Sequence, residues 1–227
     1  MEQFSRTSLL IGEENLKKLN SAKIIVFGVG GVGSFVVESL VRSGIGNISI
    51  VDFDVVDVTN INRQILALHS TIGKKKVDVM KERIQDINPN AIINTYDTFI
   101  SNETIDMFDL SDYDYAIDCI DNVTGKLLII EKCINSNTKI ISSLGTANKL
   151  DPSKLTITDI SKTNTCPLAK VVRLELRKRG INHLNVLFSS ELPIKNDTNV
   201  LGSISFVPST GGLLISSKVI SDLINEK

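Results

Sequence analysis

Short apolar runs alternate with amphipathic stretches through the first two thirds of the chain. Five mostly apolar runs have the length of strands, at 23–27, 47–51, 91–96, 113–119 and 139–143. Between them, apolar residues recur at three- and four-residue steps, as on one face of a helix, at 35–41, 73–88 and 124–137. This alternation predicts an α/β fold: a Rossmann-like, mostly parallel sheet with helices on both faces.

Less regular segments flank this series. Residues 2–20 predict one or two short helices. Beyond residue 151 the pattern predicts a strand at 154–160, a helix at 167–179, paired strands at 183–189 and 203–207, and a final helix at 213–224. In the helix at 167–179 the inward positions are Leu168, Val171, Val172 and Leu176. The polar segment 190–202 is predicted to be mobile.

We therefore expect three parts in the chain. Residues 1–22 form an N-terminal helical segment, and residues 23–150 form the Rossmann-like core. Residues 151–227 form a smaller C-terminal α+β extension, which we expect to complete the sheet and the substrate site.

Composition narrows the class of protein further. Hydrophobic residues make up 42% of the 227 positions and Trp is absent, which favours a core of Ile, Leu and Val, as in parallel sheets buried on both faces. A net charge of −1 means that any contact with nucleic acid requires a local basic face. Three cysteines without a CxxC pair argue against a disulfide framework or a structural zinc and predict a cytoplasmic protein. The uncharged stretch 198–217 is rich in Ser, Thr, Gly and Asn, so no membrane span is expected.

A glycine cluster follows the first predicted strand directly. In it, Gly28 turns the chain, Gly30 lets the backbone approach a phosphate, and Gly33 lets helix and strand pack closely. The helix that follows presents unpaired N–H groups and a positive dipole end to an anion. Asp52 ends the second strand, about 20 residues further on, where an acidic side chain binds ribose hydroxyls. These features predict nucleotide binding without specifying which nucleotide.

Polar residues after the second and fourth strands indicate a triphosphate. Asn60 and Arg63 stand in a long acidic segment after Asp52, and Lys76 belongs to a lysine cluster at the start of the helical pattern 73–88. Either these lysines are a solvated cluster, or at least one faces a polyphosphate. Asp121 follows the fourth strand, at the rim where open α/β sheets bind ligands, and can hold Mg²⁺. For Asp118, structural pairing is as good an explanation as function.

Taken in order, six motifs make a more specific pattern than the glycines alone. The set GVGGVG, VDFD, TNINRQ, GKKK, INP and DCIDN, between residues 23 and 143, resembles the ThiF/MoeB family of adenylating enzymes, which are related to ubiquitin-activating enzyme. The resemblance implies a homodimeric enzyme that forms acyl-adenylates from ATP with Mg²⁺.

The family motifs imply a role for each matching residue. Asp52 binds ribose, while Asn60, Arg63 and Lys76 bind phosphates. Asp121 binds Mg²⁺ with Asn122 beside it, and an N-terminal arginine, here Arg6, reaches into the partner's site. The implied catalytic residues are Arg63, Lys76, Asp121 and Arg6. The implied ATP-binding set is Gly28, Gly30, Gly31, Gly33, Asp52, Asp54, Asn60, Asn62, Arg63, Lys76, Asp121 and Asn122.

C-terminal motifs narrow the resemblance to one subgroup. The stretches LDP at 150–152, ITDISKT at 157–163, PLA at 167–169 and VLFSSE at 186–191 are similar to the TcdA (CsdL) subgroup, the tRNA threonylcarbamoyladenosine dehydratases. The implied substrate is a modified adenosine next to the tRNA anticodon. ATP activates its threonyl carboxylate as an adenylate, and the neighbouring carbamoyl group attacks and closes a ring. Cys166 departs from the pattern, because some members have Asp before Pro-Leu-Ala.

Several alternatives remain open at this level. An enzyme that adenylates the C-terminus of a ubiquitin-like sulfur carrier predicts zinc-binding CxxC pairs, which the chain lacks. A nucleotide-sensing module predicts loss of Arg63, Lys76 or Asp121, and a nicotinamide dehydrogenase leaves TNINRQ and GKKK unexplained. The need for a sulfur-relay partner is also open. Lys170, Arg173 and Arg177 align on the helix at 167–179, either as a tRNA-binding stripe or as a solvated face.

Overall fold

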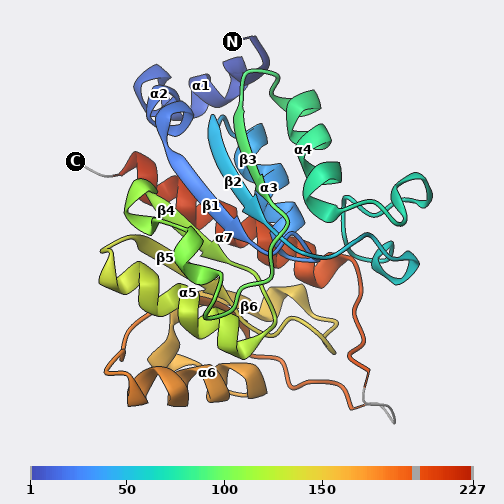
Figure 1. Cartoon of the computed structure of the whole chain (residues 1–227), viewed down its shortest axis with the longest axis vertical. Helices are drawn as coiled ribbons and strands as arrows, with labels where there is room; N and C mark the ends of the chain where they lie inside the picture. Colours follow the sequence, from blue (N-terminus) through green and yellow to red (C-terminus); the bar gives the residue numbers. More distant parts are fainter. Residues whose placement is uncertain (1, 196–199, 226–227) are drawn as a thin grey trace.

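A single twisted sheet runs through the computed structural model, which describes residues 2–195 and 200–225 (Figure 1). In these residues the sheet has seven strands, in the order β3-β2-β1-β4-β5-β7-β6. The strands are β1 (Lys23–Phe27), β2 (Asn47–Val51), β3 (Ile92–Tyr96), β4 (Tyr115–Asp118), β5 (Lys139–Ser143), β6 (Leu155–Asp159) and β7 (Asn185–Ser189). Neighbouring strands are parallel except β6 and β7. The predicted fold class is confirmed.

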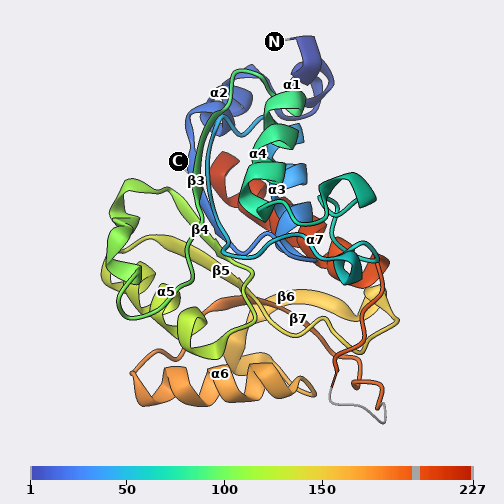
Figure 2. The ribbon, with the colours of Figure 1, turned by 45° about the vertical axis from the view of Figure 1, so that its right-hand side comes forward.

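Helices cover both faces of the sheet (Figures 1 and 2). The α-helices of the described residues are α1 (Ser5–Ile11), α2 (Glu13–Ser21), α3 (Gly33–Arg42), α4 (Lys76–Ile87), α5 (Val123–Asn135), α6 (Pro167–Lys178) and α7 (Phe206–Ile224). Apolar side chains of α3, α4 and α7 form one core with the sheet, and those of α5 and α6 form the other.

The central strand β1 shows why the sheet has two cores. Ile24 and Val26 point to the α3 side, whereas Ile25 and Phe27 point to the α5 side, and all four are fully buried. Side chains alternate across a strand, so a strand covered on both faces is apolar at every position. This is why the unbroken apolar run in the sequence predicted a strand correctly.

The C-terminal part differs from the predicted arrangement. Residues 203–207 do not form a strand, because α7 begins at Phe206, seven residues before the predicted start. Strand β7 pairs instead with β5 on one side and β6 on the other. Pro208 lies in the first turn of α7, where a missing N–H costs no helical hydrogen bond.

Helix α4 begins later than predicted, at Lys76 and not at Gly73. Gly73 has a φ of 82°, and the backbone before the helix is held by hydrogen bonds from Val56 N to Lys74 O and from Lys76 N to Asp54 O. Lys74 and Lys75 therefore lie outside the first helical turn, and only Lys76 of the cluster is buried.

Helix α6 corrects one prediction. Val171 is 46% exposed, since the inward positions are Ala169, Val172 and Leu176. Of the three aligned basic residues, Arg173 donates through its guanidinium to both the carbonyl and the hydroxyl of Thr163. Whether these residues form a tRNA-binding stripe or a solvated face stays open.

The predicted mobility of 190–202 falls partly on residues 196–199, which lie outside the described residues. In the described part, backbone hydrogen bonds join Ser190 to Lys154, Ile194 to Asn148, and Asn148 to Gly202. Within the described part of the chain, no helix has the length and apolar character needed to cross a membrane.

One carboxylate ties α3 to α4. Glu38, only 7% exposed, accepts hydrogen bonds from Arg83 (2.6 and 3.0 Å) and from Arg42 (2.7 Å). Burial alone would raise the pKa of this carboxyl, but the bonds from Arg83 and Arg42 outweigh it, so the pKa lies below its ordinary value of 4.5.

We expect Glu38→Gln to lower the free energy of unfolding at pH 7 by about 1–3 kcal/mol, since hydrogen bonds to a charged group are lost. The stabilising effect of a carboxyl with a lowered pKa is fully present above its unfolded value and disappears as the pH falls through its folded value. The difference between wild type and variant should therefore shrink below about pH 4.5. Urea unfolding of both proteins at several pH values measures this difference in the free energy of unfolding. Glu82→Gln is the control, because Glu82 is exposed on α4 next to Arg83, and an equal loss there would contradict the assignment.

Candidate functional site

The site is a cavity of about 530 Å³ at the carboxyl ends of the parallel strands. Its walls come mainly from the loops after β1, β2, β3, β4 and β5 and from the start of α7. The chain leaves β1 toward β2 on one side, and β4 lies on the other, so the cavity opens at the point where the strand order reverses. Open α/β sheets bind ligands at this switch point.

The glycine loop forms the floor of the cavity. Gly28 has a φ of 87°, which a residue with a side chain rarely adopts. A Cβ on Gly33 would lie 1.8 Å from the Gly28 carbonyl oxygen, so α3 can start this close to β1 only with glycine there. A Cβ on Gly30 would face open space, with Gln64 Nε2 the nearest atom at 3.8 Å. The backbone at Gly30 is therefore open to the cavity.

Asp52 stabilises this loop from the end of β2. One carboxylate oxygen accepts from Val29 N at 2.8 Å, and the other accepts from Asp54 N at 2.9 Å. Burial raises the pKa of Asp52, while the nearby Lys76 ammonium and the two backbone N–H groups act to lower it. The carboxylate thus both supports the glycine loop and lines the cavity.

Lys76 brings a cation to the same cavity. Its side chain is 6% exposed and its Nζ lies 2.7 Å from Asp54 Oδ2. The Asp54 side chain is 46% exposed, so the pair is buried at the lysine end and open to solvent at the carboxylate end. A ligand anion entering the cavity can replace or join Asp54 as the partner of this ammonium.

The short turn after β2 contributes polar groups of a different kind. Asn60 is buried, and its Oδ1 accepts from Asp57 N at 3.2 Å to cap the turn. The Arg63 guanidinium donates to Thr59 O at 2.9 Å and to Asn62 Oδ1 at 3.0 Å, and both of these bonds use the same nitrogen, Nη1. The rest of its donor fork remains available at the cavity wall.

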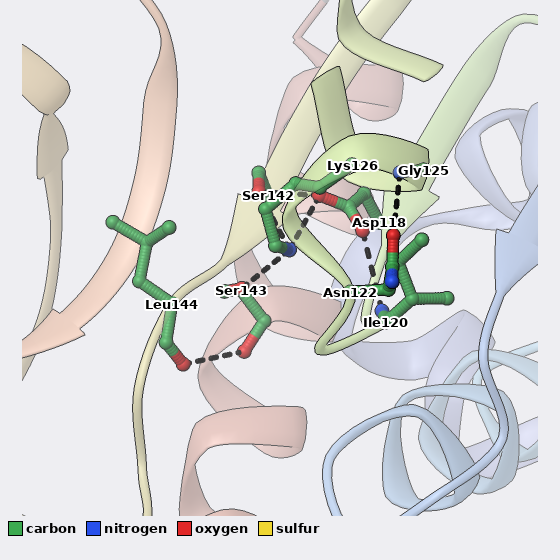
Figure 3. Close-up of polar contacts among 8 residues, drawn as sticks. All are labelled: Asp118, Ile120, Asn122, Gly125, Lys126, Ser142, Ser143 and Leu144. Atoms are coloured by element: carbon green, nitrogen blue, oxygen red, sulfur yellow. Dashed lines mark hydrogen bonds and ion pairs between the residues drawn. The ribbon is translucent and has the colours of Figure 1, made fainter. Parts of the chain in front are cut away.

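Beyond β4 the two predicted residues differ in their contacts. Asp121 is exposed, lines the cavity, and has no hydrogen-bond or ion-pair partner among the described residues. Asn122 accepts from Gly125 N at 2.8 Å as the N-cap of α5 (Figure 3). Its side-chain oxygen is therefore already used in holding the helix.

The structure brings most of the predicted set together. The cavity is lined by Gly28, Gly30, Gly31, Asp52, Asp54, Asn60, Arg63, Lys76, Asp121 and Asn122. Gly33 packs against the carbonyl of Gly28, behind the glycine loop. Asn62 donates to the carbonyl of Ser203 at 2.9 Å. Neither belongs to the lining residues.

Arg6 lies at the opposite edge of the molecule. It is exposed on α1, and its neighbour Gln3 donates to Asn88 at the end of α4. The carbonyl of Asn20, at the end of α2, accepts from Asn47 at the start of β2. The N-terminal helices thus pack where strands begin, whereas the cavity lies where strands end (Figure 1). Arg6 cannot reach the cavity of its own chain.

Other lining residues were not predicted. They are Val32, Val51, Phe53, Gln64, Thr98, Phe99, Ile100, Cys119, Ile120, Ser143, Leu144, Gly145, Thr146, Ala147, Leu168, Leu201, Ser203 and Pro208. The loop after β5 could have been found by the same strand-end rule that selected Asp121. Pro208 could not, because its place depends on the packing of α7 against Gly31, whose Cβ would lie 3.3 Å from it.

Comparison with known proteins agrees with this geometry. A family model described as the ThiF family matches residues 4–179, which include the strands and loops from β1 to β5. The chain belongs to the ThiF family.

Within the ThiF family, named relatives align over nearly the whole chain. The tRNA threonylcarbamoyladenosine dehydratase of Bacillus subtilis is 44% identical and covers 100% of this chain and 96% of its own length. The enzyme of the same name from Haemophilus influenzae is 37% identical, with 100% and 95% coverage. The crystal structure of the E. coli enzyme TcdA in complex with ATP has a TM-score of 0.92 and 33% identity, covering 98% of this chain and 94% of that one.

Gly33 and Gly30 of this ThiF-family loop differ in the space available for a side chain, and this difference can be measured as protein stability. We expect Gly33→Ala to lower the free energy of unfolding by about 3 kcal/mol or more, because the methyl group overlaps backbone that cannot move aside. Gly30→Ala should change it by less than about 1 kcal/mol, since the space is open. Urea unfolding of both variants checks this pair. Equal stability of the two variants would contradict the proposed packing.

Proposed function

We propose that this protein is an ATP-dependent tRNA threonylcarbamoyladenosine dehydratase. The observation that carries the proposal is the convergence of three features in one cavity: an open glycine loop, two cationic side chains from separate segments, and a carboxylate, Asp121, that has no partner among the described residues. The full-length similarity to dehydratases of that name supports the choice of substrate.

The cavity suits the activation of a carboxylate by ATP. A carboxylate is a poor electrophile because oxide is a poor leaving group, and adenylation supplies a good one. The protein must hold the substrate carboxylate in line with the α-phosphate and neutralise the departing pyrophosphate. We propose that Asp52 binds the ribose, and that Gly28, Gly30, Gly31 and Gly33 form the phosphate-binding turn.

The remaining polar groups act on the phosphates. We propose that Asn60 and Arg63 donate hydrogen bonds to phosphate oxygens. We also propose that the Lys76 ammonium binds a phosphate, either together with Asp54 or in place of it. Asn62 then holds the cavity wall through Ser203, 2.9 Å away. Donors that are fixed before the reaction stabilise developing charge at little reorganisation cost.

Mg²⁺ fits the donor chemistry of the cavity. This ion prefers oxygen ligands and is commonly bound by one or two carboxylates together with substrate phosphates and water. Asp121 is a carboxylate on the cavity wall with no partner in the part of the chain that the structure describes. We propose that it holds the ion, with Asn122 beside it fixing the loop. The ion would contribute charge neutralisation at the phosphates.

The second reaction step requires little from the protein chemically. The carbamoyl group and the adenylate belong to the same nucleoside, so ring closure is intramolecular and needs no thiol nucleophile. Burial raises the pKa of the Cys119 thiol, which therefore stays protonated. Cys166 is buried at the N-cap of α6, where its sulfur accepts from Ala169 N at 3.5 Å.

The C-terminal part closes the other side of the cavity. Leu168, Leu201, Ser203 and Pro208 line it together with the loop after β5. We propose that residues 151–227 complete the substrate site in this way, with residues 23–150 as the ATP-binding core and 1–22 as a helical segment. A tRNA substrate and unpaired cysteines both agree with action in the cytoplasm.

We expect the wild-type protein to convert threonylcarbamoyladenosine in tRNA to its cyclic form with formation of AMP and pyrophosphate. Arg63→Ala should reduce turnover roughly 10²-fold or more, on the order of 3 kcal/mol of transition-state stabilisation. Asp121→Asn should raise the Mg²⁺ concentration required. Both effects can be measured by mass spectrometry of the nucleoside released from tRNA and, independently, by assays of pyrophosphate formation.

Lys74→Ala is the control for loss of a cation, because Lys74 is exposed just before α4 and does not line the cavity. Near-normal turnover in Arg63→Ala would contradict the phosphate assignment. Pyrophosphate exchange that depends on a ubiquitin-like carrier and not on tRNA would favour the alternative function, sulfur-carrier activation.

We further propose that the active form is a homodimer in which Arg6 completes the partner's cavity. Arg6 cannot reach its own cavity, and Leu9 and Leu10 beside it are 88% and 85% exposed. Two leucines this exposed on one short helix are unfavourable in water and suit a protein interface.

Mixing the inactive variants Arg6→Ala and Lys76→Ala should restore activity. A mixed dimer has one cavity with both side chains intact, so random exchange should give about a quarter of wild-type turnover. The control is each variant alone after the same treatment. Mixtures that stay inactive after exchange has been shown by mass spectrometry would exclude a shared site.

A further inference from the structure

A fully buried ion pair lies at the end of β4, next to residues that line the cavity (Figure 3). Lys126 Nζ is 2.6 Å from Asp118 Oδ2, and both side chains are completely inaccessible to solvent. Ser142 stands between them: its hydroxyl donates to Asp118 Oδ2 at 2.5 Å and is 3.2 Å from Lys126 Nζ. The three side chains come from the end of β4, the first turn of α5 and β5.

The pair bonds to the backbone of two cavity loops. Asp118 Oδ1 accepts from Ile120 N at 3.2 Å, next to Asp121. Lys126 Nζ donates to Ser143 O at 2.9 Å, at the start of the loop that lines the cavity from 143 to 147. All three donors of the ammonium group are thereby used, so the network has no spare hydrogen-bonding capacity on the lysine.

The loop after β4 in turn touches the glycine loop. A Cβ on Gly28 would lie 3.0 Å from the Cys119 carbonyl and from Ile120 Cγ2. The glycine loop, the Asp121 loop and the loop after β5 are therefore connected through Ile120 and the ion pair. A displacement of Ile120 would shift the backbone of the Asp121 loop and change the packing against Gly28.

Stability alone does not explain a pair at this place. Removing two charges from water is expensive, and well-packed apolar residues of the same volume often give equal or greater stability. Burial raises the pKa of the Asp118 carboxyl, and Lys126, Ser142 and Ile120 N–H all act against that rise. What apolar residues cannot supply is the directed bonding to two loop backbones.

We propose that the Asp118–Lys126 pair, with Ser142, positions the Asp121 loop and the 143–147 loop around the substrates during adenylation. These residues do not touch the substrate, so they are positioning residues. The inference rests on the proposed function, because adenylation is the step that needs the alignment. On the proposed assignment, the ribose and phosphates are held by the glycine loop and by the segment after β2, which the pair does not contact. We therefore expect the pair to affect turnover and not ATP binding.

The test replaces the pair by apolar residues of similar size, Asp118→Leu with Lys126→Met. We expect a folded protein whose kcat is reduced roughly 10²-fold, as for misalignment of about 1 Å, while KM for ATP changes less than about threefold. Glu38→Gln is the control, because it removes a different buried charge that does not line the cavity and should lower stability with kcat unchanged. Ser142→Ala is the milder variant in case the double variant does not fold, with a smaller fall of kcat in the same direction.

Hydrogen exchange of the backbone gives a readout that does not depend on activity. Amides at 119–122 and 144–146 should exchange faster in the variants, whereas amides of α3 and α4 should not. If wild type shows no dehydratase activity, the proposed function fails, and the exchange rates still decide the role of the pair. Normal kcat with unchanged exchange in these loops would overturn the inference. It would also be overturned if Glu38→Gln lowered kcat as much as the pair variants do, because the loss would then follow from lower stability alone.

Discussion

Helix α3 begins so close to the end of β1 that a side chain at Gly33 would overlap the carbonyl of Gly28, 1.8 Å from the Cβ position. This approach places the helix N-terminus and the loop backbone at the centre of the sheet, where the strand order reverses. The other cavity walls are built against the same loop. Asp52 bonds to Val29 N, Cys119 and Ile120 pack on Gly28, and Pro208 packs on Gly31.

The charged side chains in and next to the cavity differ in how deeply they are buried. The Asp118–Lys126 pair is inaccessible and serves the backbone, whereas the Lys76–Asp54 pair is buried only at the lysine end. Asp121 is exposed and without a partner among the described residues. A buried pair is rigid because breaking it leaves an uncompensated charge, while a half-exposed pair can exchange one partner for a ligand at low cost. Structural and ligand-binding charges are thus separated by depth.

The two ends of the described chain lie in different places relative to this cavity. Helix α7 returns across the sheet and packs along α3, where Gly212 leaves no room for a side chain against Val32 O at 2.6 Å. Its first turn thereby reaches the cavity through Pro208. The N-terminal helices remain at the opposite edge, with Leu9 and Leu10 in solvent. In a single subunit, the site is closed by the C-terminal helix and not by Arg6.

The sequence by itself determined the series from β1 to β5 and most of the candidate site. Central parallel strands are buried on both faces, so their apolar runs are continuous, and the residues after each strand necessarily meet at one edge. The pattern failed where tertiary packing overrides local preference. The alternation at 203–207 reads as a strand, yet these residues precede or begin α7, because Gly211 and Gly212 fit closely against Leu187 and α3. Only the tertiary structure decided that Asp118 pairs with Lys126 and that Arg6 lies away from its own cavity, since both depend on distances between elements that no local pattern records.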